Sequence, residues 1–131
     1  MIMKIAIPVV KSGEKYFLVP HFGRAPAFAI VDVGDSQFKV LEVFQNVHEA
    51  HEHGKVSGLL HELLSREVQA ILTMGIGYGA FYRLKDLGLK IFYVRPSPGK
   101  ATISLEEAVE NFISGKVEEA GEPKEADDHH N

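Results

Sequence analysis

The feature that most constrains the fold is an almost unbroken run of apolar residues near the beginning of the chain, IMKIAIPVV at residues 2–10. Such a run is typical of a strand buried on both faces, because a strand with one solvated face alternates apolar and polar residues. Proline has no N–H to donate to a sheet, so we predict that Pro8 lies near the end of this strand. The run therefore predicts a sheet that other elements cover on both sides.

Two further strand-like runs, at residues 27–33 and 38–44, follow a short extended piece at residues 16–19. The segment Gly34-Asp35-Ser36 between the two runs predicts a tight antiparallel hairpin. In the second run we expect strict alternation, so that residues 38, 40 and 42 face one side of the sheet and residues 39, 41 and 43 face the other. Neither set is purely polar, so both faces of this strand are expected to be partly covered.

The second half of the chain alternates helices and strands. Leucines at helical spacing predict a helix from Val56 to about Glu67, and Ser104 and Gly115 are placed to begin and stop the last helix. The remaining predicted elements are strands at residues 68–74 and 90–94 and a helix at residues 80–87. A hairpin followed by βαβ units predicts an α/β domain with a mixed sheet and helices on both faces.

The length of 131 residues suits a single domain with a substantial core, which we expect over residues 1–117. Residues 118–131 carry six of the 18 acidic residues, one of the 14 basic residues and little apolar content. That composition predicts a disordered acidic tail. The rest of the chain is close to neutral, with 12 acidic and 13 basic residues. A nucleic acid is therefore a poor partner, because binding one needs a basic excess.

The chain contains no cysteine, which excludes disulfides and any iron–sulfur cluster or structural zinc held by thiolates of the protein. A metal would have to be held by histidine, carboxylate, backbone or the atoms of its own ligand. No apolar run approaches the roughly 18 residues of a membrane span. The first residues lead directly into a strand pattern without the layout of a signal peptide. We therefore expect a cytoplasmic protein with no membrane partner.

The most unusual segment is the loop PHFGRAPAF at residues 20–28, in which His21 and Arg24 lie close together. Its prolines fix the backbone, its glycine permits a positive φ, and Phe22 and Phe28 supply apolar anchors at either end. An imidazole beside a permanent cation suits an anionic ligand that also contains a metal. The alternative is a hairpin connection whose histidine and arginine are simply solvated.

A second candidate site is the turn Gly75-Ile76-Gly77-Tyr78-Gly79, which joins a predicted strand to a predicted helix. Unpaired N–H groups at the start of a helix attract anions, so the turn is a candidate anion cradle. Tight packing of strand against helix is an equally good explanation for the glycines. A dinucleotide site is disfavoured, because the position about 20 residues further on, where an acidic residue is expected, is near Arg95.

Histidine is concentrated in the segment NVHEAHEHG at residues 46–54, which contains His48, His51 and His53. Asn46 has the character of a helix start, whereas the final glycine would interrupt a helix, so a loop is equally compatible. The spacing does not match a known zinc motif, although three imidazoles can bind nickel, zinc or copper.

No catalytic set emerges from the sequence. There is no nucleophile elbow with a Ser/His/Asp arrangement, no cysteine nucleophile and no Walker glycine–lysine loop. The order of elements is shared with nucleases that hold Mg²⁺ on carboxylates, but residues 2–10 contain no acidic residue. We therefore expect a protein that is not an enzyme.

Together these features resemble the dinitrogenase iron–molybdenum cofactor-binding family over residues 4 to about 117. The segments that carry the resemblance are His21-Phe22-Gly23-Arg24-Ala25-Pro26, Phe28-Ala29-Ile30-Val31-Asp32, Asn46, His53-Gly54, Gly75-Ile76-Gly77 and Leu87-Gly88-Leu89. The resemblance implies a ribonuclease-H-like α/β fold of about five strands. It also implies a small stand-alone member of a family that binds the cofactor or its precursor cluster during nitrogenase assembly.

Transferred by position, the resemblance assigns His21 as the ligand to an iron of the bound cluster and Arg24 as the balance for the cluster's negative charge. Phe22 and Gly23 of the same loop are also expected to bind the cofactor, as are Gly75, Gly77 and Gly79, whose amides are expected to face the same crevice. A preassembled iron–sulfur or iron–molybdenum cluster brings its own sulfides, which is compatible with a chain without cysteine. The implied partners are the cluster, or an anionic small ligand, and cofactor-assembly proteins.

The residues also leave a different function open. His48, His51 and His53 make the chain a candidate sensor of a divalent metal or a small anion. In that case the histidine segment, rather than the His21 loop, would supply the metal ligands.

Overall fold

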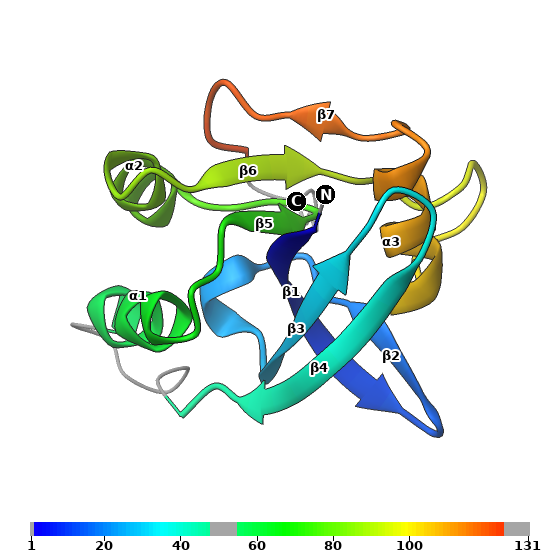
Figure 1. Ribbon diagram of the computed structural model, residues 1–131, viewed down its shortest axis with the longest axis horizontal. Coiled ribbons are helices and arrows are strands. Elements are labelled where there is room, and N and C mark those ends of the chain that lie inside the picture. Colours follow the sequence, from blue (N-terminus) through cyan, green and yellow to red (C-terminus); the bar gives the residue numbers. More distant parts are fainter. Residues whose placement is uncertain (1, 48–54, 125–131) are drawn as a thin grey trace.

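The computed structural model describes residues 2–47 and 55–124, in which three α-helices cover a seven-stranded mixed sheet (Figure 1). The strands are β1 (Met3–Ser12), β2 (Lys15–Leu18), β3 (Ala27–Val33), β4 (Phe38–Gln45), β5 (Ala70–Thr73), β6 (Lys90–Tyr93) and β7 (Glu118–Glu119). The helices are α1 (Lys55–Ser65), α2 (Tyr78–Asp86) and α3 (Leu105–Ile113), and a 3₁₀ turn, η1, spans Phe22–Arg24. The strand order is β4-β3-β1-β5-β6-β7, with β2 paired to β1. None of the helices in these residues has the length and hydropathy to span a membrane.

Strand β1 is the centre of the sheet, and both of its faces are buried, as the apolar run predicts. Ile5, Ile7 and Val9 enter the core beneath α3, whereas Ala6 enters the core beneath α1 and α2. Figure 1 shows α1 and α2 on one side of the sheet and α3 on the other. This three-layer arrangement confirms the predicted α/β class.

The position of Pro8 differs from the prediction. Pro8 lies inside β1, paired with Phe28 of β3, rather than near the end of the strand. On its other side, β1 pairs with β5 only as far as Ala6 and with β2 only from Val9 onward. The carbonyl of Pro8 faces that side, where it accepts from the Val19 amide at 3.2 Å. The missing N–H therefore falls at the junction between two neighbouring strands, where a sheet bond is not needed.

The hairpin of β3 and β4 confirms the predicted turn, which Gly34 closes by donating to the carbonyl of Gln37 at 2.8 Å. The expected strict alternation in β4 is wrong. Ile30 pairs with Glu42 and the next residue of β3 pairs with Val40, so Leu41 is an extra residue in a β-bulge. The bulge reverses which face each later residue of β4 occupies.

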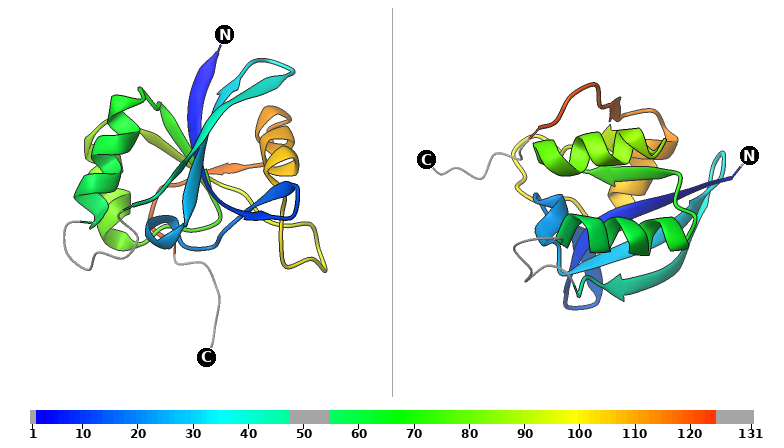
Figure 2. Two further views of the ribbon diagram at one scale, coloured as in Figure 1. Left: turned by 90° about the horizontal axis from the view of Figure 1, so that it is seen from below. Right: turned by 90° about the vertical axis from the view of Figure 1, so that its left-hand side faces the viewer.

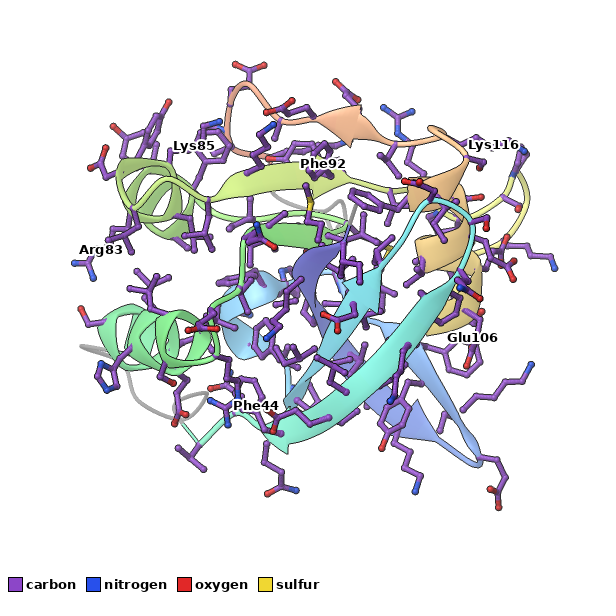
Figure 3. The ribbon with its side chains drawn as sticks, in the orientation of Figure 1. Phe44, Arg83, Lys85, Phe92, Glu106 and Lys116 are labelled. Carbon is purple, nitrogen blue, oxygen red and sulfur yellow. The ribbon has the colours of Figure 1, made fainter. Side chains whose placement is uncertain are left out.

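Aromatic side chains mark the two cores. Phe44, near the end of β4, stacks on Phe28 with ring centroids 6.0 Å apart on the side of α1 and α2. Phe92 of β6 packs edge-on against Phe112 of α3 at 5.1 Å on the opposite side. Figure 3 labels Phe44 and Phe92 at these two places. The two faces of the sheet are thus packed independently.

The helices begin and connect largely as the sequence predicts. The Ser104 side chain accepts from the Glu107 amide at 3.1 Å and caps α3. Arg83 of α2, labelled in Figure 3, donates to the Ser57 hydroxyl of α1 at 2.7 Å, so the two helices on this face are joined directly.

The prediction of a disordered tail is wrong for its first seven residues, 118–124. Strand β7 pairs with β6, and Ala120 is buried and donates its amide to the Ile91 carbonyl at 2.8 Å. Pairing with an open sheet edge supplies backbone hydrogen bonds that a polar composition does not reveal. The remaining tail residues lie outside the described ones.

Candidate functional site

Two buried aromatic side chains anchor the His21 loop to the core. Phe22 and Phe28 are both buried and pack edge-on with ring centroids 5.1 Å apart. The backbone between them forms η1, which packs against α1. This burial makes Phe22 an anchor of the loop rather than a contact for a ligand.

A buried asparagine fixes the same loop from the side. The Asn46 side chain is in the core, and its Nδ2 donates to the Ala25 carbonyl at 2.9 Å and to the Gly23 carbonyl at 3.4 Å. The Asn46 amide also donates to the Pro26 carbonyl at 2.9 Å. One residue at the end of β4 thus satisfies three carbonyls of the loop. The sequence around Asn46 is equally compatible with a helix start and a loop, and neither interpretation predicts this tether.

The polar side chains of the loop remain accessible. His21 is partly exposed and Arg24 is exposed, so the imidazole and the guanidinium can both meet a ligand. Gly23 lies outside the left-handed region, and a Cβ added there would meet no atom of the described residues within 4 Å. The backbone at Gly23 is therefore open to close approach from outside, and no steric contact requires glycine there.

The glycine turn connects β5 to α2. Gly77 is the N-cap of α2 and offers no side chain to cap it, so the first N–H groups of the helix lack a side-chain acceptor at that position. A Cβ added at Gly79 would meet no atom of the described residues within 4 Å. Tight packing therefore does not explain Gly79. Thr73 closes the beginning of the turn by donating its hydroxyl to the Gly75 carbonyl at 2.9 Å.

The register of the strands brings the loop and the turn to one edge of the sheet. Val9 of β1 pairs with Ala27 of β3, which pairs with Gln45 of β4, and β5 runs parallel to β1. The His21 loop, the end of β4 and the glycine turn therefore meet at the carboxyl edge of β1 and β5. In the left view of Figure 2, η1 lies at the end of the molecule opposite the amino terminus. Ligands of open α/β sheets bind at such an edge.

The structure does not describe the other predicted metal ligands. His48, His51 and His53 lie outside the described residues. Within residues 2–47 and 55–124, no three His, Cys, Asp or Glu side chains are gathered so that they could hold a metal ion. In this part of the chain, His21 can offer a single imidazole to a metal that brings its other ligands with it.

Comparison with known proteins agrees with this architecture. The orange protein from Desulfovibrio gigas, in its apo form, has a TM-score of 0.76 at 24% identity, over 93% of this chain and 96% of that one, which shows a shared ribonuclease-H-like fold. A Thermotoga protein described as a candidate NifB protein has a TM-score of 0.70 at 27% identity, over 89% and 92%.

Two sequence comparisons go further than the fold. An uncharacterized protein of Methanocaldococcus jannaschii is 30% identical over 117 residues, which cover 89% of this chain and 91% of that protein. The family model described as dinitrogenase iron-molybdenum cofactor matches residues 3–115. The chain therefore belongs to the dinitrogenase iron–molybdenum cofactor family.

Proposed function

We propose that this protein binds a preassembled, metal-containing anion, such as an iron–sulfur or iron–molybdenum cluster or its precursor, as cargo and without catalysing a reaction. The single observation that carries the proposal is the meeting of the tethered His21–Arg24 loop and the open end of α2 at one edge of the sheet. Family membership supports the choice of cargo. One of its structural relatives is described as a candidate NifB protein.

The chemistry divides among three groups. The imidazole of His21 supplies one nitrogen to a metal of the cluster, whose other ligands are the cluster's own sulfides. The guanidinium of Arg24 neutralises part of the negative charge and donates hydrogen bonds. The N–H groups at the start of α2, beginning at Gly77, add the positive end of a helix dipole.

Anaerobic titration with an extruded iron–sulfur cluster tests the assignment of His21. We expect His21→Ala to weaken binding by at least about tenfold, because the loss of a residue that only supports a metal ligand already costs that much. His61→Ala is the matched control, because His61 is exposed on α1, and this variant should bind like the unsubstituted protein. Equal affinity of the His21→Ala and His61→Ala variants would refute the role of His21.

Gly79→Ala distinguishes an effect on cluster binding from an effect on folding stability. Alanine is the better helix former by about 1 kcal/mol, and the added Cβ has room in the described structure, so the variant should be at least as stable. Cargo that approaches the turn closely would nevertheless meet the new methyl group and bind more weakly. A Gly79→Ala variant that is more stable but binds the cluster with unchanged affinity would show that the turn is not part of the site.

The competing sensor function requires His48, His51 and His53, which lie outside the described residues. Calorimetry with Ni²⁺ and Zn²⁺ on the chain ending at Lys124 distinguishes the two functions. If the protein carries a cluster, it should bind these metal ions weakly. Replacing His48, His51 and His53 by alanine should then abolish that weak binding and leave cluster binding unchanged. Tight metal binding that disappears with the three imidazoles would favour the sensor.

A further inference from the structure

The segment from Glu118 to Lys124, which we term the clasp, runs antiparallel to β6 from the carboxyl end of that strand and then reaches the glycine turn. Its first two residues form β7 and pair with β6. Its last residue, Lys124, forms a bridge with Ile76, between the first two glycines of the turn. The Ile76 amide donates to the Lys124 carbonyl at 2.7 Å, and the Lys124 amide donates to the Ile76 carbonyl at 3.0 Å.

The clasp is anchored between its two ends. Ala120 is buried and donates to Ile91, and the Tyr93 hydroxyl donates to the Glu122 carbonyl at 2.8 Å. The Lys124 ammonium also lies 5.4 Å from the centroid of the Tyr93 ring. The clasp is thus also held against β6, so the backbone bridge between Lys124 and Ile76 is one of several contacts.

The place at which the clasp holds the turn matters for α2. Ile76 directly precedes Gly77, the N-cap residue that has no side chain to fix the start of the helix. The buried Ile76 side chain holds one side of the turn in the core, and Lys124 holds the backbone polar groups on the other. The direction of the first N–H groups of α2 therefore depends on a strand-like bridge to the carboxyl-terminal segment.

We propose that the clasp is a positioning element of the cargo site, which holds the glycine turn in the conformation that presents the amino end of α2 to the ligand. The inference rests on the proposed function in so far as that end of α2 contacts the cargo. It assigns a role in binding to residues whose composition alone predicts a disordered tail.

A pair of substitutions at one position tests the clasp. Lys124→Pro removes the N–H that the Ile76 carbonyl accepts, whereas Lys124→Ala keeps both backbone hydrogen bonds and removes the side chain whose ammonium lies near the Tyr93 ring. We expect amide exchange at Ile76 to be about tenfold faster in the proline variant than in the alanine variant. Exchange in β1 should be the same in both. Equal protection of Ile76 in the two variants would overturn the inference.

The same variants connect the clasp to binding. Titrated with an extruded iron–sulfur cluster under anoxia, Lys124→Pro should bind about fivefold more weakly than Lys124→Ala, which keeps both backbone hydrogen bonds to Ile76. Binding that is equal in both variants while Ile76 is deprotected in one would refute the positioning role. If the unsubstituted protein binds no cluster, the proposed function fails, and the exchange experiment still decides whether the clasp holds the turn.

Discussion

Replacing Asn46 by alanine tests how the candidate site is held together. The Asn46 side chain lies in the core and donates to the carbonyls of Ala25 and Gly23, and the first of these is the shorter bond at 2.9 Å. Asn46→Ala leaves the buried Ala25 carbonyl without this donor. The substitution keeps both His21 and Arg24 and removes a tether of the loop that carries them, so a change in binding reports on the shape of that loop.

The expected loss of stability follows from the burial of these groups. Leaving a buried acceptor unsatisfied costs about 1–3 kcal/mol, and we expect a value of about 2 kcal/mol here, because the second bond is long. The unfolding entropy of about 2.1 cal/mol/K per residue converts this loss into a fall in Tm of roughly 7 °C for a chain of this length. Cluster affinity should fall in parallel.

Thermal and urea unfolding measure the effect, with two comparison variants. Gln45→Ala removes an exposed side chain from the neighbouring position and should change Tm by less than about 2 °C. Asn46→Asp keeps the size of the side chain, but at neutral pH it directs a carboxylate at carbonyl oxygens and should destabilise at least as much as alanine. An Asn46→Ala variant that unfolds within about 1 °C of the unsubstituted protein would refute the tethering argument.

Two further predictions concern helix α3 and the clasp. Ser104→Ala removes the cap of α3 and should lower the free energy of unfolding by about 1 kcal/mol in urea titrations, and an unchanged urea midpoint would contradict the cap. Burial, with the charges of Glu118 and Glu122, raises the pKa of Tyr93 to about 12. A tyrosine of the unfolded chain ionises near pH 10, so the stabilisation is complete below about pH 10 and is lost as the pH rises to about 12. Tyr93→Phe should therefore flatten the fall of Tm across that range, and an equally steep fall would show that other groups cause it.

The overall fold could be predicted because the burial of its elements is encoded locally. Each face of β1 is apolar, and the leucines of α1 recur at helical spacing, so the layers follow from the sequence pattern alone. The bulge at Leu41 and the place of Pro8 depend instead on where neighbouring strands begin and end. Such pairings join residues that are distant in the sequence and leave no periodic signal.

The candidate site was predictable only in part, for a similar reason. The unusual composition around His21 identified the loop, and its two phenylalanines are the anchors that the sequence predicts. Asn46 was missed as a tether because its acceptors lie 21 and 23 residues earlier in the chain. The clasp was missed because Ala120 is its one strongly buried residue among polar neighbours.

The extra residue in β4 bears on how this protein behaves at high concentration. In the described part of the chain, β4 is the last strand on its side of the sheet, and Val40 and Leu41 are both exposed by about two-fifths. A flat strand of that kind would offer an approaching molecule a row of unused N–H and C=O groups. The irregular spacing at Leu41 puts those groups out of step halfway along. Two molecules that meet along β4 consequently cannot form a continuous intermolecular β-sheet over the full length of the strand.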